Sequence, residues 1–399
     1  MTGPGRPLRV AAIGYAFMGK AHSHAWRNVA SYFDVPAYEQ AVLVGRAADQ
    51  VAAAAARYGW TESSTDWRAV IARDDIDIVD ICAPGDLHAE IAIAALVAGK
   101  HVLVEKPLAT TVGEARDMAA AAELARRRGV RSMIGFNYRR VPALALAREL
   151  IAEGRLGTVR QVRVAYLQDW LVDPNAPMTW RLRRQNAGSG ALGDLASHAI
   201  DQVEFLLGAR VTGVSARTHT FVTERPGEAG SEPVTVDDAA WATLDLDSGA
   251  VASVEVSRMA LGRKNSLRIE VYGETGSLSF DLESLNELGF LDGTQPVRET
   301  GERRILVTEP EHPFVGAWWP QGHMLGWEHS FVHEIAAFLG AIRDGADPSP
   351  SFDDGLRVQL VLDAIERSSA AGQLRVTLPL EPLPLEPPPL DTTLEGDRP

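Results

Sequence analysis

The 399-residue sequence has little of several features that would place it in other protein classes. It has one cysteine, Cys82, which excludes an internal disulfide and a multi-cysteine metal site. It has no apolar run near the roughly 20 residues that cross a bilayer, and no secretion leader is visible at its N-terminus. Its formal net charge of -14 disfavours binding to phosphate backbones. We therefore expect a cytoplasmic protein that binds neither nucleic acid nor membrane.

Short apolar runs alternate with helical patterns in the first third of the chain. Strands are expected at 8–13, 41–44, 76–82, 101–104 and 131–136, with helices between them. A strand that is apolar throughout is typical of a parallel sheet with helices on both faces. The pattern predicts a doubly wound Rossmann domain over residues 1–137, within an α/β protein.

The pattern changes after residue 137, because strands now follow one another. They are expected at 160–168, 211–222, 240–246, 251–256, 267–272 and 277–280, with helices at 142–153, 192–207, 327–343 and 353–371. This predicts an α+β domain over 138–378 with a large, open, mostly antiparallel sheet. Residues 293–321 are expected to form an irregular loop that lines a pocket or contacts a subunit. Residues 379–399 are expected to form a Pro-rich extended tail.

A glycine-rich turn follows the first strand and precedes a helix, a context in which backbone N–H groups can bind a pyrophosphate. It reads Gly14-Tyr15-Ala16-Phe17-Met18-Gly19, with Ala16 in place of the middle glycine. The second strand ends at Gly45, where an acid usually accepts from the ribose hydroxyls. The next residue, Arg46, could stack on adenine or bind a 2'-phosphate. The sequence therefore leaves NAD and NADP both open.

Two segments carry groups suited to proton transfer. Lys106 follows a buried strand and so emerges at the edge of the sheet where ligands bind, and Glu105 is expected to hold its charge. Asp194 and His198 lie four residues apart on an expected helix and share a face, as Asp201 does approximately. An ammonium can assist at a substrate oxygen, and histidine suits proton transfer near neutral pH. These segments predict an acid and base pair for oxidation of an alcohol.

Several of these stretches together resemble the glucose-fructose oxidoreductase and inositol dehydrogenase family over about residues 8 to 375. Within it, the segments 166–170, 180–181 and 188–194 are most similar to the levoglucosan dehydrogenases. The stretches that carry the resemblance are Gly14 to Gly19, Glu105-Lys106-Pro107, Ala83-Pro84 with His88, Asn137-Tyr138-Arg139, and the glycine-rich lead into Asp194 and His198.

The resemblance implies hydride transfer between NAD(P), with a slight preference for NAD, and a secondary alcohol of a sugar, anhydrosugar, glycoside or cyclitol. It implies His198 as the base, Lys106 assisting at the oxygen, Asp194 positioning the substrate, no metal, and a homodimer or homotetramer through the second sheet. Residues assigned to the cofactor are Gly14, Ala16, Phe17, Met18, Gly19, Arg46, Ala83, Pro84, His88, Glu105, Lys106, Asn137, Trp180 and Arg181. Residues assigned to the substrate are Lys106, Tyr138, Arg139, Gln168, Trp170, Asp194, His198 and His323.

Three alternatives stay open at this point. The reaction could run as reduction of a ketosugar, since both directions use the same groups. The fold could serve a regulator that binds NAD(P) without chemistry. His329 and His333, at i and i+4 on an expected helix, could bind a metal.

Overall fold

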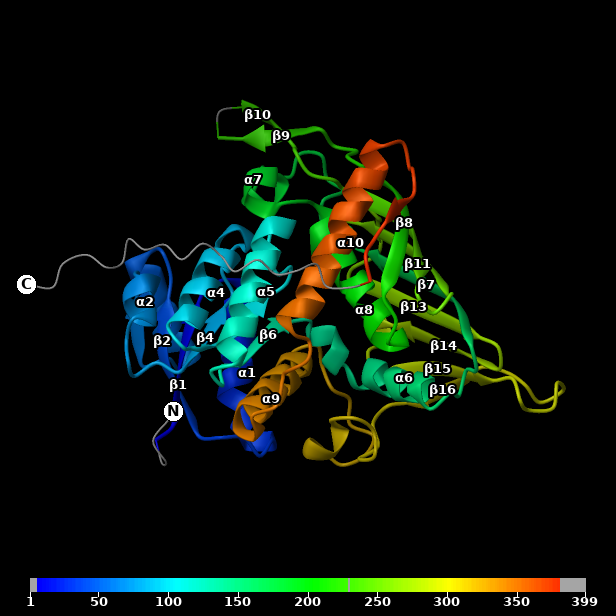
Figure 1. The fold of residues 1–399 in the computed structure, drawn as a ribbon, viewed down its shortest axis with the longest axis horizontal. Helices are drawn as coiled ribbons and strands as arrows, with labels where there is room; N and C mark the ends of the chain where they lie inside the picture. Colours follow the sequence, from blue (N-terminus) through cyan, green and yellow to red (C-terminus); the bar gives the residue numbers. More distant parts are fainter. Residues whose placement is uncertain (1–5, 229, 381–399) are drawn as a thin grey trace, which may run out of the picture.

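The computed structural model describes residues 6–228 and 230–380 and contains two large sheets (Figure 1). The N-terminal sheet has six parallel strands in the order β3-β2-β1-β4-β5-β6, the Rossmann arrangement that the sequence predicted. The chain reverses its direction across the sheet between β1 and β4, so their carboxyl ends border the ligand crevice. The strands are β1 (Leu8–Ile13), β2 (Tyr38–Val44), β3 (Glu62–Ser64), β4 (Ile78–Ile81), β5 (His101–Glu105) and β6 (Ser132–Gly135).

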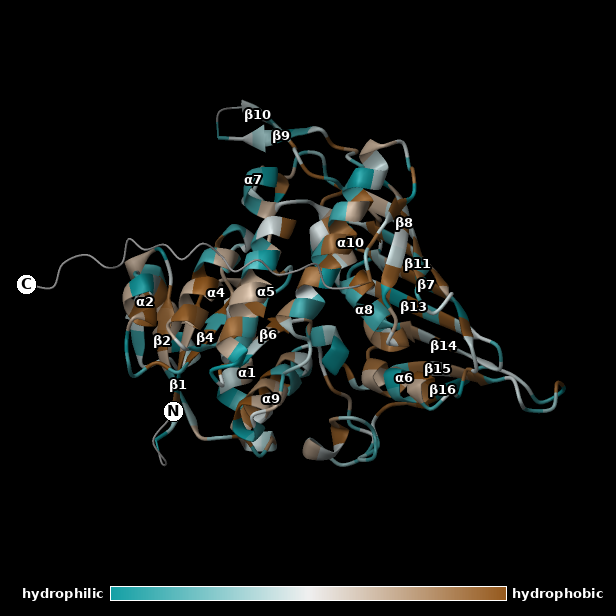
Figure 2. Ribbon diagram, in the orientation of Figure 1, coloured by the Kyte–Doolittle hydropathy of each residue, from teal (hydrophilic) through white to brown (hydrophobic). Residues whose placement is uncertain are grey.

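Helices cover both faces of this sheet because its strands are apolar on both sides (Figure 2). Val10 and Ala12 face one layer, formed by α1, α2 and α9, whereas Ala11 and Ile13 belong to the core that includes α4, α5 and α10. The helices are α1 (Phe17–Tyr32), α2 (Ala48–Tyr58), α3 (Trp67–Ile71), α4 (His88–Val97), α5 (Val112–Arg126), α9 (His329–Asp344) and α10 (Phe352–Ala370).

The second sheet has nine strands in the order β16-β15-β14-β13-β7-β12-β11-β8-β17. It is mostly antiparallel, as predicted, except that β7 and β12 run parallel. Its strands are β7 (Val159–Leu167), β8 (Val211–His219), β11 (Ala239–Leu246), β12 (Val251–Ser257), β13 (Ser266–Gly273), β14 (Gly276–Asp281), β15 (Glu287–Asp292), β16 (Arg303–Leu306) and β17 (Val376–Thr377). The sequence did not predict β3, β15, β16, β17 or the hairpin β9 (Glu224–Gly227) and β10 (Gly230–Pro233), which are mostly short.

Helices α6 (Pro142–Ala152), α8 (Ser197–Leu207) and α10 cover the inner face of the second sheet. Helix α10 also contacts α5, which packs on the first sheet (Figure 1). The two sheets thereby share one core, in which Val164, Ile200 and Val361 are buried. The outer face of the second sheet carries no helix among the described elements. A short helix, α7 (Arg184–Ala187), lies beside η1 (Gly85–Leu87) near the top of Figure 1.

The stretch 293–321 is largely irregular, as predicted, but it also contains regular elements. It contains strand β16 and a turn η6 (Val315–Ala317), and Trp318 packs against Tyr32 of α1 and His329 of α9. Its aromatic residues therefore pack within the chain.

The division into domains at residue 137 stays a prediction, and the predicted tail falls outside the described residues from 381 onward. A search of the described helices found none with the length and apolarity that a bilayer crossing requires.

Candidate active site

The central contact of the site joins Lys106 to Asp194, residues that lie far apart in the sequence. The Nζ of Lys106, just after β5, donates to Asp194 Oδ1 and to the Asp194 carbonyl oxygen, both at 2.9 Å. Glu105, which was expected to hold this ammonium, instead accepts the Lys106 backbone N–H at 3.1 Å. Asp194 is therefore the counter-ion of Lys106, and the expectation for Glu105 was wrong.

Arg258 is a second cation on Asp194 that sequence reasoning missed. It is only 2% exposed, and its Nη2 donates to Asp194 Oδ2 at 2.8 Å. Burial alone would raise the pKa of Asp194, but the charges of Lys106 and Arg258 hold that pKa below its usual value. The sequence did not point to Arg258 because it does not give the relative direction of strands. In the structure β12 runs parallel to β7, so Arg258 after β12 and Gln168 after β7 lie at the same sheet edge.

A glycine-rich segment delivers Asp194 and His198 to this edge. Both carboxylate oxygens of Asp237 accept backbone N–H groups, from Gly190 and from Leu192, at 2.7 Å. A Cβ at Gly190 would lie 1.8 Å from the Asp237 carbonyl oxygen, so only glycine fits there. Asp194 then sits in a π-helical turn, η4 (Leu192–Ala196), rather than in the regular α-helix that was predicted. Such turns re-aim side chains and recur at functional sites.

His198 differs from His22 and His88 in that no described residue forms a hydrogen bond with its ring nitrogens. The ring nitrogens of His22 contact Asp80 and Glu105, and those of His88 contact two backbone carbonyls. Within the described part of the chain, no hydrogen bond engages the His198 ring, whose centroid lies 4.5 Å from that of Tyr138. Burial, reinforced by the Lys106 cation, lowers the pKa of His198 well below its ordinary value. The imidazole is thus neutral and able to accept a proton.

The turn at the end of β1 fits a dinucleotide pyrophosphate. Gly14 has a φ of 115°, and a Cβ there would lie 2.5 Å from the Cys82 carbonyl oxygen. A Cβ at Gly19 would lie 2.0 Å from the Gly14 carbonyl oxygen. The first turn of α1 begins at Phe17 without a side-chain cap, which leaves its N–H groups for an anion. Ala16 is exposed at this turn, and Met18 is half-buried behind it.

The end of β2 explains why glycine replaces the ribose acid. A Cβ at Gly45 would lie 2.1 Å from the ring of Tyr15, whose hydroxyl donates to Gln50 Oε1 at 3.0 Å. An aspartate at position 45 would therefore collide with Tyr15. Arg46 is exposed next to this pair.

Glu105 belongs to a buried polar network beneath the turn. Its Oε1 lies 2.9 Å from His22 Nε2, while His22 Nδ1 lies 2.9 Å from Asp80, which also accepts the indole N–H of Trp26. Burial would lower the pKa of His22, but the charge and hydrogen bond of Asp80, together with the contact with Cys82, outweigh it and raise that pKa well above its ordinary value. Glu105 therefore fixes the Lys106 backbone from below, a role that differs from direct cofactor contact.

Three further predicted residues are also engaged by protein groups. His88 places Nδ1 at 3.0 Å from the Pro107 carbonyl oxygen and Nε2 at 2.9 Å from that of Ala83, so it bridges two loops beside Pro84. Asn137 donates to Ser330 Oγ at 2.8 Å. Arg139 forms a buried ion pair with Asp201 at 2.6 Å. These contacts are with protein groups, and they show that Asp201 pairs with Arg139 rather than with Lys106.

Three of the residues predicted to bind the sugar belong to one group of hydrogen-bonded side chains. Tyr138, Gln168 and Trp170 are joined by hydrogen bonds through Tyr166, which lies in the segment 166–170 that carries the resemblance, and through Asn265, which the sequence did not reveal.

Trp180 and Arg181 lie in η3 (Trp180–Leu182), where the guanidinium stacks on the indole at 4.5 Å. His323 is exposed, and its recorded side-chain contact is the Pro320 carbonyl oxygen at 2.7 Å. The structure does not connect His323 with Lys106, Asp194 or His198 among the contacts it describes.

The His329 and His333 pair is engaged in packing. His333 Nε2 accepts the indole N–H of Trp318 at 2.7 Å, and its Nδ1 lies 2.9 Å from the Arg140 carbonyl oxygen. A metal would have to displace the indole from this lone pair. The described residues that could surround an ion are His22, Asp80 and Cys82, but His22 and Asp80 are bonded to each other there.

Comparison with known proteins gives the family. Residues 8–136 match the oxidoreductase family with an NAD-binding Rossmann fold, and residues 144–279 match the GFO/IDH/MocA C-terminal domain. The chain belongs to the Gfo/Idh/MocA oxidoreductases. It is an NAD-binding enzyme of this family, and its α/β fold agrees with the prediction.

Among Gfo/Idh/MocA proteins, the chain is 41% identical to levoglucosan dehydrogenase of Pseudarthrobacter phenanthrenivorans, over 91% of this chain and 96% of the relative. A crystal structure of an oxidoreductase domain protein from Kribbella flavida is 55% identical, with a TM-score of 0.92 over 94% of this chain and 99% of that one. A structure of levoglucosan dehydrogenase in complex with NADH and levoglucosan is 40% identical, with a TM-score of 0.90 over 94% and 100% of the two chains.

Proposed function

We propose that this enzyme oxidises a secondary alcohol of a sugar or anhydrosugar, with Lys106, Asp194 and His198 at the reacting carbon. The observation that carries the proposal is the meeting of the Lys106–Asp194 ion pair with a neutral histidine whose ring nitrogens are unengaged. The levoglucosan complex of a 40% identical relative supports an anhydrosugar as the substrate class.

Lys106, His198 and Asp194 have separate roles in the proposed reaction. A nicotinamide held beside these residues would supply the hydride acceptor. Lys106 donates a hydrogen bond to the substrate oxygen and stabilises negative charge that develops there as the proton leaves. His198 accepts that proton, and Asp194 holds Lys106 in place while the buried Arg258 holds Asp194. The reverse reaction, reduction of a ketosugar, uses the same groups in the opposite protonation states.

The proposed cofactor is NAD, in keeping with the NADH complex of the relative. Gly14 and Gly19 support the pyrophosphate, with contacts from Ala16, Phe17, Ala83 and Pro84. NADP remains chemically possible because no carboxylate stands at Gly45 to repel a 2'-phosphate.

A Lys106→Met variant tests the assignment. Turnover of levoglucosan, other anhydrosugars and inositol with NAD or NADP is expected to fall by about 100-fold or more, whereas nucleotide affinity, measured by fluorescence titration, stays within a few-fold. Lys264→Met makes the same change at an exposed ion pair with Asp169 and is expected to keep full rate. Full activity of Lys106→Met would overturn the assigned role, and a wild-type enzyme that binds NAD but turns over no alcohol would favour the regulator.

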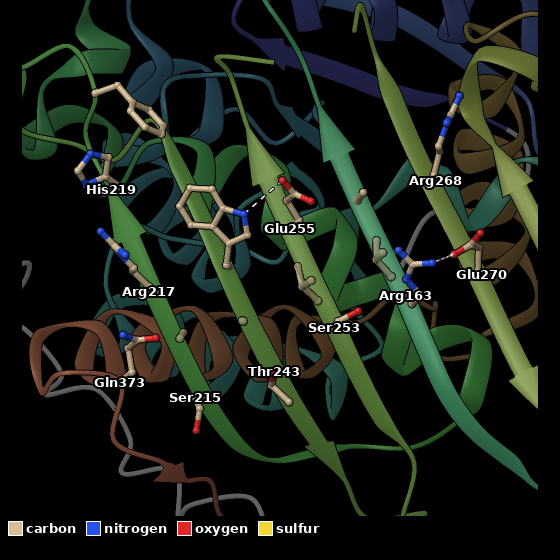
Figure 3. Close-up of a pocket in the computed structure, with 17 residues that line it drawn as sticks. Arg163, Ser215, Arg217, His219, Thr243, Ser253, Glu255, Arg268, Glu270 and Gln373 are labelled. Atoms are coloured by element: carbon tan, nitrogen blue, oxygen red, sulfur yellow. Dashed lines mark hydrogen bonds and ion pairs between the residues drawn. The ribbon is translucent and has the colours of Figure 1, made fainter. Parts of the chain in front are cut away.

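We further propose that two copies of the chain associate through the outer face of the nine-stranded sheet. A hollow on this face is lined by residues of β7, β8, β11, β12 and β13, and side chains of both charge signs project from it (Figure 3). Phe221 is 53% and Trp241 37% exposed there. An exposed apolar patch with paired charges is typical of an interface between subunits.

A further inference from the structure

A continuous chain of hydrogen bonds links five side chains on the substrate side of the site. The Trp170 indole N–H donates to Gln168 Oε1 at 2.9 Å, and Gln168 Nε2 donates to Asn265 Oδ1 at 2.8 Å. Asn265 Oδ1 also accepts the Tyr166 hydroxyl at 2.7 Å, and the Tyr166 and Tyr138 oxygens are 2.9 Å apart. This series of hydrogen bonds therefore runs from the exposed Trp170 to Tyr138, whose ring packs at a tilt against that of His198.

The indole fixes the orientation of both amides, because an indole nitrogen can only donate. Gln168 must turn its carbonyl oxygen toward Trp170, so its amide nitrogen faces Asn265. Asn265 must then present its own carbonyl oxygen, since two amide nitrogens in contact would leave both hydrogen bonds unmade. The orientation of the Asn265 amide thus follows from the indole N–H of Trp170 at the other end of this series of hydrogen bonds.

The same logic fixes the hydroxyl hydrogens of the two tyrosines. Asn265 Oδ1 can only accept, so the single hydroxyl hydrogen of Tyr166 points to Asn265. The bond between the tyrosines then requires the hydrogen of Tyr138, which points to Tyr166. Burial raises the pKa of Tyr166 well above its ordinary value, so Tyr166 keeps its hydrogen.

We propose that Asn265 is a positioning residue that makes the Tyr138 oxygen an obligate acceptor and so selects a substrate hydroxyl that donates to it. The site then favours a polyol with a free hydroxyl beside Tyr138 and rejects an ether or fluorine at that position. The inference rests on the proposed function only in naming a polyol as the ligand.

Neutron diffraction from deuterium-exchanged crystals of the full chain tests the polarity directly. The expected map shows the Tyr138 deuteron between the two tyrosine oxygens and the Tyr166 deuteron between Tyr166 and Asn265. A Tyr138 deuteron that points away from Tyr166 would overturn the proposal. This measurement needs no turnover, so it decides the polarity even if the enzyme oxidises no sugar.

Kinetic discrimination tests the consequence. The probes are levoglucosan and its mono-O-methyl derivatives at each hydroxyl in turn. In the wild type, one derivative is expected to lose about 10- to 100-fold in kcat/KM, because Tyr138 cannot donate to an ether. In Asn265→Leu, the hydroxyl hydrogens of Tyr166 and Tyr138 can turn the other way, so that Tyr138 can donate to the ether. The ratio of kcat/KM for levoglucosan to kcat/KM for this derivative is then expected to shrink to within a few-fold, while nucleotide affinity is unchanged.

Two variants separate polarity from packing. Asn265→Asp offers only acceptor oxygens and is expected to retain the wild-type ratio. Asn28→Leu, on α1, makes the same substitution where the amide contacts only His24 and is expected to change nothing. A ratio that stays at the wild-type value in Asn265→Leu contradicts the proposal, since a merely structural residue would lower all rates alike.

Discussion

At the scale of residues, burial and the nearby Lys106 cation determine the protonation state of His198. Lys106 and Arg258 both bond to Asp194, so the cluster carries an excess positive charge beside a buried imidazole. A nearby cation and burial both disfavour the imidazolium. Both effects outweigh the attraction of the Asp194 carboxylate, and the pKa of His198 is lowered.

This shift sets the expected pH dependence. Because the native pKa of His198 is depressed, the base stays unprotonated below about pH 6.5, the ordinary histidine value. We expect kcat/KM to stay constant as pH falls through that value and to decline only at lower pH. The same shift means that the unfolded state binds the proton more readily, so His198 lowers folding stability as pH falls below about 6.5.

A pH profile of kcat/KM, with His24→Gln as a surface control, checks this expectation. A decline with a midpoint at or above the ordinary histidine value in the wild type would show that His198 is not the depressed base described here.

At the scale of elements, the loops that follow the strands contact one another as well as forming the site. His88, at the start of α4, contacts the carbonyl oxygens of Ala83, after β4, and of Pro107, after the Lys106 turn. The parallel pair β7 and β12 likewise places Gln168 and Arg258 at one edge. The precision of the site therefore depends on contacts between loops as well as on the strands.

Replacing His88 by Leu removes this tie while keeping an apolar side chain. We expect kcat/KM to fall by about 10-fold and stability to fall by about 1–2 kcal/mol, because a buried carbonyl oxygen loses the one N–H that the neutral His88 ring can donate. Urea unfolding and steady-state kinetics measure the two effects. A loss of stability with unchanged kcat/KM would limit His88 to folding.

At the scale of the whole molecule, helices cover both faces of the first sheet and the inner face of the second, and no described helix covers the outer face of the second sheet. The apolar side chains on that face, Phe221 and Trp241, lie over strands with charges of both signs. A second copy of the chain can cover this face by symmetry, which makes each patch its own partner.

The double variant Phe221→Asp with Trp241→Asp tests this association. Placing carboxylates in the apolar part of the interface is expected to raise the dissociation constant by about 30-fold or more, as measured by sedimentation velocity over a concentration series. Leu124→Asp, an exposed apolar position on α5, is the control. Identical sedimentation of the wild type and the double variant would exclude this face as the interface.

The order of strands and helices in the first sheet followed from the sequence because strands that are apolar on both faces leave few arrangements. Gly14, Lys106 and the pair of Asp194 and His198 were found because each stands beside a strand end or a glycine-rich turn. Arg258 and Asn265 could not be found in this way, since no local motif marks them and their positions depend on strand direction. His88, Asn137 and Arg139 were predicted near strand ends as binding residues, which stays a prediction, and packing decides which protein groups their side chains contact.

The sequence by itself determined the family, the nucleotide fold and the residue types available for proton transfer, because these depend on local patterns of polarity and glycine. Only the tertiary structure decided that Asp194 neutralises Lys106, that His198 remains unengaged and that Tyr138 is turned into an acceptor. Those outcomes arise from contacts between segments that are distant in the sequence. The donor or acceptor role of each group depends on its partner in those contacts, which exist only in the folded chain.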